Sequence, residues 1–231
     1  MQMTGSNTSS VKIFGRDAAG YDNVRRGLIP CFDFFYGSAL DLIDDWGGGK
    51  EPRVLDIGAG TGLFSSLLLT RVPGARVHLL DASGAMLDEA RQLLSGHAVT
   101  FECSDMAEAS FGEGEWDLVI SALAIHHLDD PAKKSLFRKI HASLREGGLF
   151  VNAEQVLGST PAQEDRYRRL WLAQVRGSGV SEHEITKAEE RMRHDRCVSV
   201  GNQLFWLQEV GFRETDCVFK MWRFAVLAAW K

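Results

Sequence analysis

The sequence lacks several features that would place it in a common class of protein. It has four cysteines in 231 residues and no Cys-x-x-Cys pair, so we expect neither a zinc site nor a disulfide scaffold. No apolar run approaches the roughly 20 residues that a membrane span needs, and the polar start, Met1 to Ser10, has no signal-peptide core. These absences predict a cytoplasmic protein without a membrane partner. The cysteines, which we predict to be reduced and buried, are Cys31, Cys103, Cys197 and Cys217.

An excess of basic charge is also missing. The formal net charge is −5, whereas a sequence-independent grip on nucleic acid needs basic faces that neutralise phosphates. With 45% hydrophobic residues, the chain suits one α/β domain with a modest elaboration. Two arginine clusters are interleaved with acids, and we interpret them as solvated helix faces. This interpretation weakens the case for a tRNA substrate without excluding it. The clusters are Arg166, Arg168 and Arg169, and Arg191, Arg193 and Arg196.

The most informative segment is the glycine-rich run from Val54 to Gly62, Val-Leu-Asp-Ile-Gly-Ala-Gly-Thr-Gly. Its apolar residues suit a strand covered on both faces, and its glycines suit a turn whose backbone can approach a ligand. The pattern therefore predicts a buried strand, a glycine loop and a helix from Leu63 to about Thr70, capped by Thr61.

The spacing of the glycines decides between two classes of cofactor. The dinucleotide fingerprint G-x-G-x-x-G needs a third glycine where this chain has Leu63. Asp56 instead completes the pattern D-x-G-x-G-x-G, which resembles motif I of the class I S-adenosylmethionine-dependent methyltransferases. The resemblance implies that S-adenosylmethionine lies against Asp56, Gly58, Ala59 and Gly60. A glycine turn without a ligand is one alternative. A nicotinamide oxidoreductase is another, opposed by the spacing and by the lack of a Tyr-x-x-x-Lys motif.

An acid follows the next predicted strand, Ala75 to Leu80, about 20 residues after the glycine loop. Asp81 is thus placed to accept hydrogen bonds from both ribose hydroxyls or, in the other interpretation, to cap a helix that begins near Ser83. The resemblance implies that Ala82 and Met86 lie against the adenine, although a methionine at this helical spacing also suits the core.

Two later segments extend the resemblance. Asp105 and Met106 follow a short strand, and in the family they would bind the adenine amino group and a ring nitrogen. An acid in a surface loop is the alternative for Asp105. The run from Trp116 to Leu128 predicts a buried strand and a loop. By resemblance, the backbone at Ser121 and Ala122 would meet the methionine part of the cofactor.

His126 and His127 end this run, and the resemblance places them near the methyl acceptor. Imidazole titrates near neutral pH, so both are candidate catalytic residues that could act as a general base. Paired histidines also occur in this loop of the family without a base role. We expect no metal here, because neighbours in sequence lack the i, i+4 spacing of a helical zinc site.

Strands and helices alternate from residue 53 to about 156, which predicts a doubly wound parallel sheet. A helix is expected at Pro131 to Leu144 and the next strand at Leu149 to Glu154. The resemblance adds a final hairpin and implies a Rossmann-like, mostly parallel, seven-stranded α/β sheet whose last strand is antiparallel. We divide the single domain into an N-terminal helical cap segment (1–50), a cofactor-binding core (51–160), a helical insertion (161–210) and a strand hairpin (211–231).

The two segments outside the minimal fold are predicted to set the substrate. The stretch from Tyr21 to Ile43 and the insertion after Pro161 contain helices with an apolar face, which suggests a cap that excludes water from the ligand edge. Arg25 or Arg26 is the first candidate for an anionic contact, to the cofactor carboxylate or to the acceptor; the alternative is a surface charge. For Trp171 we predict a core residue on the apolar face of its helix and not a residue of the cap.

We therefore predict methyl transfer from S-adenosylmethionine, leaving S-adenosylhomocysteine, to a nitrogen, oxygen or carbon of a small molecule. The chain is also remotely similar to carboxy-S-adenosylmethionine synthase, a relative that modifies the cofactor for tRNA chemistry. By a hand alignment on Gly211-Phe212, Trp206 replaces the arginine that grips the extra carboxylate, which argues against that activity. A tRNA-related methylation and a non-catalytic cofactor-binding subunit are further alternatives. By analogy with relatives, exposed strand or cap surfaces could support a homodimer.

Overall fold

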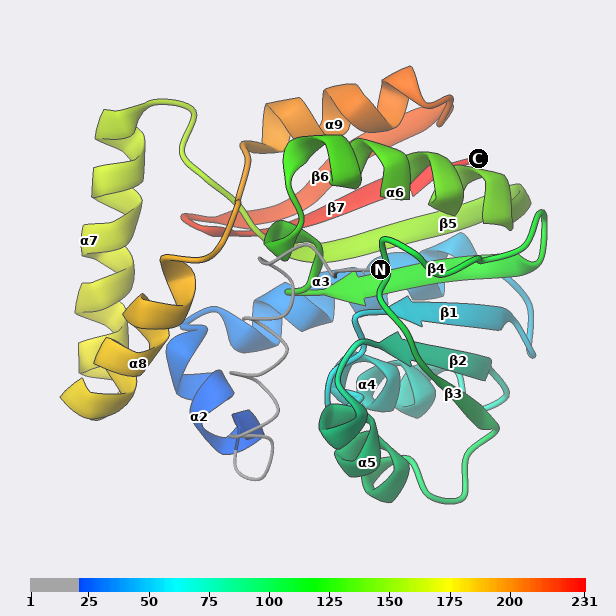
Figure 1. The fold of residues 1–231 in the computed structure, drawn as a ribbon, viewed down its shortest axis with the longest axis horizontal. Coiled ribbons are helices and arrows are strands. Elements are labelled where there is room, and N and C mark those ends of the chain that lie inside the picture. The colour runs from blue at the N-terminus through cyan, green and yellow to red at the C-terminus, as the bar shows by residue number, and fades with distance from the viewer. Residues whose placement is uncertain (1–20) are drawn as a thin grey trace.

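A seven-stranded sheet forms the centre of the protein, in the strand order β3-β2-β1-β4-β5-β7-β6 (Figure 1). The computed structural model describes residues 21–231, with side chains from Arg25 onward. Strands β1 to β5 pair in parallel, whereas β7 is antiparallel to β5 and β6. The predicted doubly wound, mostly parallel sheet with an antiparallel last strand is confirmed. The strands are β1 (Arg53–Ile57), β2 (Arg76–Asp81), β3 (Val99–Cys103), β4 (Trp116–Ala122), β5 (Leu144–Gln155), β6 (Glu214–Met221) and β7 (Phe224–Trp230).

Helices cover both faces of the sheet. Helices α3, α4 and α5 pack on one face, and α6 and α9 pack on the other. Helices α2, α7 and α8 instead stand beyond the carboxyl ends of the parallel strands, at the left in Figure 1. The helices are α2 (Tyr21–Leu28), α3 (Phe32–Trp46), α4 (Leu63–Arg71), α5 (Gly84–Leu93), the 3₁₀ turn η1 (Ile125–His127), α6 (Asp130–Ser143), α7 (Pro161–Gly177), α8 (Glu182–Met192) and α9 (Val200–Glu209).

Strand β1 lies between β2 and β4, and its residues 54–57 are all buried, as its apolar sequence requires. Its carboxyl end opens into the glycine loop, and α4 begins at Leu63 as predicted. Thr61 is not the cap of this helix. Gly62 occupies the N-cap position without a side-chain bond, and Thr61 is buried inside the loop.

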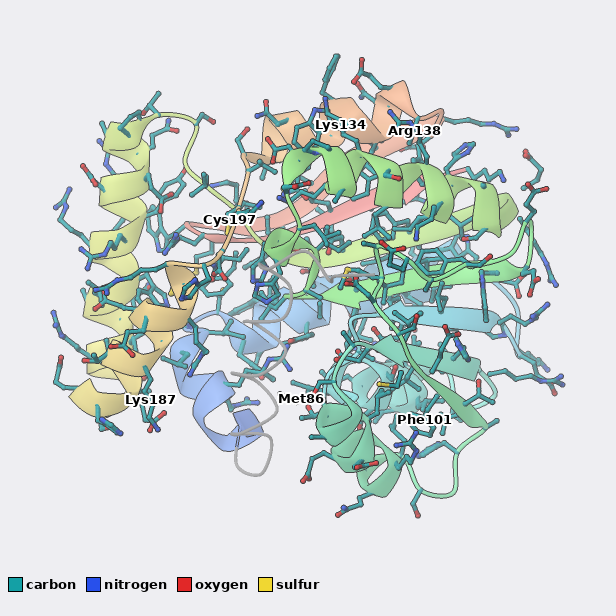
Figure 2. The ribbon with its side chains drawn as sticks, in the orientation of Figure 1. Met86, Phe101, Lys134, Arg138, Lys187 and Cys197 are labelled. Atoms are coloured by element: carbon teal, nitrogen blue, oxygen red, sulfur yellow. The ribbon has the colours of Figure 1, made fainter. Side chains whose placement is uncertain are left out.

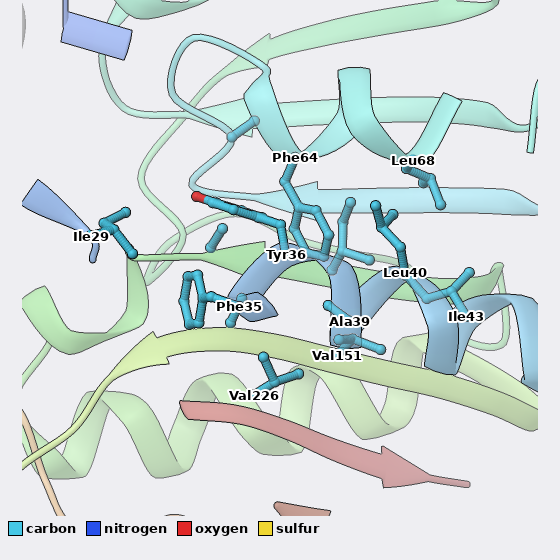
Figure 3. Packing of buried hydrophobic residues seen from close by; sticks show 14 of the residues in the cluster. Ile29, Phe35, Tyr36, Ala39, Leu40, Ile43, Phe64, Leu68, Val151 and Val226 are labelled. Carbon is cyan, nitrogen blue, oxygen red and sulfur yellow. The ribbon is translucent and has the colours of Figure 1, made fainter. Parts of the chain in front are cut away.

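Helix α3 belongs to the core. Phe35 has none of its surface exposed and Tyr36 has 2%, and both pack in one cluster with Phe64 of α4 (Figure 3). Their face of the helix lies over β5, β6 and β7. The expected N-terminal cap segment, 1–50, therefore contributes α2 to the ligand edge and α3 to the sheet. Residues 1–20 of that segment lie outside the described part of the chain.

The expected insertion, 161–210, also has two parts. Helices α7 and α8 stand at the ligand edge, where Trp171 and Ala188 are buried in the same apolar cluster as α3. Helix α9 lies over β6 and β7 beside α6, so it covers the sheet (Figure 1). Only the first two helices of the insertion are therefore placed to shape a ligand site.

Strand β5 begins at Leu144, well before the predicted start at Leu149. Leu144 pairs with Trp116 of β4, and the register then shifts before Leu118. The strand therefore continues through an irregularity that takes up Gly147 and Gly148.

All four cysteines are free. Cys31 and Cys197 are buried as predicted, but Cys103 is exposed and Cys217 is only half-buried, because they lie in β3 and β6, the two edge strands of the sheet. In the described part of the chain, no helix combines the length and the apolar character needed to cross a membrane.

Candidate active site

The glycine loop joins β1 to α4 at the carboxyl edge of the sheet. Gly58, Gly60 and Gly62 have positive φ angles of 68°, 57° and 80°. Gly58 is pressed against the loop after β4, where a Cβ would come within 2.3 Å of a side chain. The amides of Gly58 and Ala59 donate to the carbonyl of Leu80. At Gly60, by contrast, a Cβ would meet nothing within 4 Å, so the loop offers bare backbone to open space where the sequence predicts the cofactor.

Asp81 ends β2 and ties the glycine loop to the start of α5. Its Oδ2 accepts the N–H of Gly60 and its Oδ1 accepts the N–H of Ser83, both at 2.8 Å. Burial raises the pKa of Asp81, against the hydrogen bonds from Ser83 and Gly60. Ser83 is the N-cap of α5, so the capping interpretation of Asp81 is wrong. The carboxylate keeps lone pairs for further donors beside the loop.

Asp56 is buried near the carboxyl end of β1, with 1% of its surface exposed. Its Oδ2 accepts the hydroxyl of Ser65 at 2.6 Å, while its Oδ1 has no hydrogen-bond partner among the described residues. Burial raises the pKa of Asp56 to about 7, although the Ser65 bond and the charge of Arg25 act to lower it. A buried carboxylate oxygen without a donor fits the amino group of a ligand at this end of the loop.

Ala82 and Met86 follow Asp81 along the chain. Ala82 is half-buried between β2 and α5, and its carbonyl accepts from the Cys103 thiol at 3.8 Å. Met86 has 4% of its surface exposed and lies on the buried side of α5 (Figure 2). Both interpretations of Met86, as a core residue and as an adenine contact, therefore stay open.

Asp105 and Met106 are brought to the glycine loop by the turn after β3. The Nζ of Lys139, on α6, donates to the carbonyl of Met106 at 2.8 Å and fixes this turn. Asp105 is half-buried, and its Oδ1 accepts the N–H of Ala107 at 2.9 Å. The Met106 Cε lies 3.1 Å from the place of a Cβ on Gly58. Met106 thus lies against the loop that the sequence assigns to the same ligand, and Asp105 precedes it in the same turn.

The chain turns sharply at the end of β4. The Ser121 hydroxyl is buried and donates to the carbonyl of Ile57 at 2.7 Å, which ties β4 to β1 beside the glycine loop. Ala122 is 8% exposed, and Leu123 has a φ of 52°, a left-handed conformation that is strained for a residue with a side chain. This turn delivers η1, with both histidines, to the ligand edge.

His126 is held by Glu154 at the end of β5. Its Nδ1 lies 2.5 Å from Glu154 Oε1, and its backbone N–H donates to Oε2 at 2.9 Å. Burial acts to lower the pKa of His126, but the carboxylates of Glu154 and Asp195 outweigh it and the net shift is upward. For His127, burial and the neighbouring His126 lower the pKa.

Asp195 reaches the histidines from the segment between α8 and α9. Its Oδ1 lies 3.4 Å from His127 Nδ1 and 3.6 Å from His126 Nε2, and its Oδ2 accepts from Gln155 Nε2 at 2.7 Å. Burial acts to raise the pKa of Asp195, but the hydrogen bond from His127 and the charge of His126 lower it overall. Asp195 stands among arginines in a stretch that the sequence predicts to be solvated, so no sequence signal distinguishes it from a surface acid.

Lys133 fixes these two segments to each other. Its side chain, on α6, is 1% exposed, and its Nζ donates to the carbonyls of Leu128 and Arg196. The N–H of Arg196 in turn donates to the carbonyl of His126 at 2.8 Å. A buried lysine that bonds two backbone carbonyls locks the loop after β4 to the segment that carries Asp195. No local pattern in the sequence marks this residue.

A pocket with a cavity volume of about 90 Å³, open to solvent at its mouth, lies against the histidines and is walled by α2, α7 and α8. Arg25, which is 9% exposed, and Arg191 give it positive charge. Arg26 points elsewhere, since it pairs with Asp33 on the surface. Trp171 Nε1 donates to the carbonyl of residue 28 at 2.9 Å and joins α7 to α2. Trp171 is thus both a buried residue of the core stripe and a wall of the pocket.

Solved structures share this architecture. A methyltransferase from Leishmania major that depends on S-adenosylmethionine aligns with a TM-score of 0.71 and 18% identity, covering 98% of this chain and 82% of that one. DhpI, solved as a complex with SAH, aligns with a TM-score of 0.67 and 18% identity, covering 99% of this chain and 98% of that one. At these identities the likeness establishes the Rossmann-like fold alone.

Comparison of sequences gives information on function as well as on the fold. The Methyltransferase domain family matches residues 54–148, from β1 into β5. The carboxy-S-adenosyl-L-methionine synthase of Trichodesmium erythraeum is 26% identical over 188 residues, covering 78% of this chain and 73% of that protein. These matches identify residues 54–148 as a methyltransferase domain and, with the fold, support an S-adenosylmethionine-dependent methyltransferase of class I. The methyltransferase thus carries its cofactor motif on β1 and the following loop, where Asp56, Gly60 and Asp81 converge.

In this methyltransferase, Gly60→Ala should weaken the binding of S-adenosylhomocysteine at least about tenfold. The added methyl group would enter the open space over the loop, where the family binds its cofactor. Gly114→Ala is a matched control, because Gly114 has a φ of 59° and a Cβ there would also meet nothing within 4 Å. Both variants should lose about 1 kcal/mol of stability to the left-handed backbone. Calorimetric titration should find that only Gly60→Ala loses affinity, and an equal loss in both would contradict the assignment.

The stability of the methyltransferase should depend on pH through Asp56. Its pKa is about 7 in the folded protein against an ordinary value of 3.8, so the folded state holds a proton that the unfolded state has released. The unfolding free energy should therefore fall as pH rises from about 4 to about 7, by up to about 4 kcal/mol, and then level off. Urea unfolding of the wild type and Asp56→Asn across this range measures the effect. Parallel pH profiles for the two proteins would refute the assignment.

Proposed function

We propose that this methyltransferase transfers a methyl group to a small molecule held in the pocket between α2, α7 and α8. The observation that carries the proposal is that Leu123, His126 and His127 line the pocket, in the segment after β4 that packs against Gly58 of the glycine loop. Helices α7 and α8 pack into the same apolar cluster as the core. The core therefore holds these two pocket walls in position, and water cannot enter the pocket from the side that they cover. The acceptor atom, nitrogen, oxygen or carbon, is left open.

The described residues fit the cofactor of the family. The orphaned Asp56 Oδ1 suits its amino group, and the Asp81 carboxylate suits the two ribose hydroxyls. Arg25 is placed between the loop and the pocket, where its charge suits the cofactor carboxylate or an anionic acceptor. The cofactor supplies a methyl group on a sulfonium, so the protein has mainly to hold and orient the acceptor.

The test is product formation with a set of small acceptors. The protein is incubated with S-adenosylmethionine and mixtures of phenols, carboxylic acids and amines, and S-adenosylhomocysteine is measured by mass spectrometry. Met192→Trp should fill the pocket and lower turnover at least about tenfold while the affinity for S-adenosylhomocysteine stays unchanged, and Met192→Leu should behave as the wild type. Activity on bulk tRNA that Met192→Trp leaves unchanged would overturn the small-molecule proposal.

A second candidate is synthesis of a carboxylated cofactor, favoured by the relative from Trichodesmium. Against it, Trp206 stands where our hand alignment expects the carboxylate-binding arginine, and it is buried between α9 and α6 beside Lys134. Incubation with S-adenosylmethionine and carboxylic acids would distinguish the two. A cofactor whose mass has risen by that of CO₂, because a carboxyl group replaces one hydrogen, in place of S-adenosylhomocysteine, would favour this candidate.

A further inference from the structure

Three potential metal ligands meet at the floor of the pocket. His126, His127 and Asp195 each offer one donor atom, and the three atoms lie within 4.8 Å of one another. The two histidine nitrogens are 3.6 Å and 3.4 Å from Asp195 Oδ1. Around an ion with bonds of about 2.1 Å, neighbouring ligand atoms lie about 3.0–3.4 Å apart, so two of the three separations need little change.

Two of the three potential ligands, His126 and Asp195, are oriented by hydrogen bonds from neighbouring side chains. Glu154 is 1% exposed and binds His126 Nδ1, which turns Nε2 toward Asp195. Gln155 donates to Asp195 Oδ2, which leaves Oδ1 facing the histidines. A carboxylate behind a ligating histidine is the usual second layer of a protein metal site. The bond from Arg196 to His126 O and the Lys133 clamp hold the two contributing segments together.

From this geometry we infer that His126, His127 and Asp195 form a binding site for a divalent transition-metal ion of the zinc type. Two imidazoles and one carboxylate suit Zn²⁺, Co²⁺ or Fe²⁺ and do not suit Mg²⁺ or Ca²⁺, which prefer oxygen ligands alone. Three protein ligands leave a coordination position open, as in catalytic sites, and all three residues line the pocket. The expectation from sequence that no metal binds depended on the two histidines alone, without Asp195.

The open position gives the ion a role toward the acceptor. An acceptor hydroxyl or carboxylate bound there would be fixed beside the loop after β4, and a hydroxyl would lose its proton to solvent more readily than in water. The site therefore favours an acceptor that presents oxygen. This role rests on the proposed function, whereas ion binding itself does not.

The experiment is a calorimetric titration of chelator-treated, tag-free protein with Zn²⁺, Co²⁺ and Mg²⁺. We expect one equivalent of Zn²⁺ and of Co²⁺ to bind and no Mg²⁺. Asp195→Ala and His127→Ala should each weaken Zn²⁺ binding at least about 100-fold, and Glu154→Gln about 10-fold. His97→Ala removes an exposed imidazole elsewhere and should bind as the wild type. The visible spectrum of bound Co²⁺ should lack thiolate bands, which excludes the cysteines as ligands.

Controls separate this inference from the proposed function. Thermal unfolding reports whether each variant folds, and Asp195→Asn, which keeps the side-chain volume, replaces Asp195→Ala if the latter does not. S-adenosylhomocysteine is titrated in parallel, and the variants of the metal-ligand residues should still bind S-adenosylhomocysteine. No binding of Zn²⁺ or Co²⁺ by wild-type protein that binds S-adenosylhomocysteine would overturn the metal site and leave the cofactor site intact. Zn²⁺ binding that survives both Asp195→Ala and His127→Ala would overturn it as well.

Discussion

Asp81→Ala is expected to raise the Kd for S-adenosylhomocysteine about 100-fold or more. The half-buried carboxylate lies beside the glycine loop, where hydrogen bonds to a charged group contribute about 1.5–3 kcal/mol each. Loss of the two bonds expected to the ribose hydroxyls corresponds to at least two orders of magnitude in affinity. The substitution also removes the acceptor of the Gly60 N–H, so the loop itself is less well fixed. Calorimetric titration with S-adenosylhomocysteine measures the effect.

Two variants make this result specific. Asp88→Ala removes an exposed acid of α5 that pairs only with Arg91 among the described residues, and it should leave the affinity unchanged. Asp81→Asn keeps the shape of the side chain and should give an intermediate loss. If Asp81→Ala folds and its Kd for S-adenosylhomocysteine is within about threefold of the wild-type value, Asp81 does not bind the ribose hydroxyls.

The cofactor edge could be predicted from sequence because its signals are local. Gly58 and Gly60 meet a backbone requirement within a few residues, and Asp81 is the last residue of its strand. Parallel strands place their carboxyl ends at one edge, so motifs far apart in sequence meet without any knowledge of packing. Asp105 and Met106 reach the loop for the same reason, since they follow β3.

The acceptor side could not be predicted in the same way. Asp195 lines the pocket because η1 and the end of β5 lie opposite it, and nothing near Asp195 in sequence signals that position. The same holds for Lys133, whose partners are the carbonyls of Leu128 and Arg196. Such contacts arise only when distant segments pack, whereas a charged residue by itself is most simply interpreted as solvated.

Helix α3 illustrates a second limit of the sequence. An apolar helical face is the same pattern whether it covers a sheet or closes a pocket, and only its partners distinguish the two. The partners of α3 are β5, β6 and β7, which come much later in the chain. The N-terminal segment was therefore predicted as one cap, whereas the structure gives α2 to the pocket and α3 to the core.

The placement of α3 predicts the largest stability effect among the substitutions considered. Phe35→Ala should lower the free energy of unfolding by about 3–5 kcal/mol, because the ring has no exposed surface and packs against the rings of Phe219 and Phe224. The adjacent Phe34 is a matched control on the same helix, since it is 75% exposed and its truncation should change stability by no more than about 0.5 kcal/mol. Urea unfolding followed by tryptophan fluorescence measures both.

The same comparison tests whether α3 unfolds with the sheet or as a separate lid. A helix of the core takes part in the cooperative transition of the whole domain, so Phe35→Ala should move the urea midpoint and leave the slope unchanged. A detachable lid would instead open locally, and truncating its buried ring would lower cofactor or acceptor affinity with little change in the global midpoint. A small shift of the urea midpoint for Phe35→Ala, similar to that of Phe34→Ala, would indicate that α3 is part of the cap and not of the core. A large shift with unchanged slope would leave α2, α7 and α8 as the elements that determine which acceptor enters.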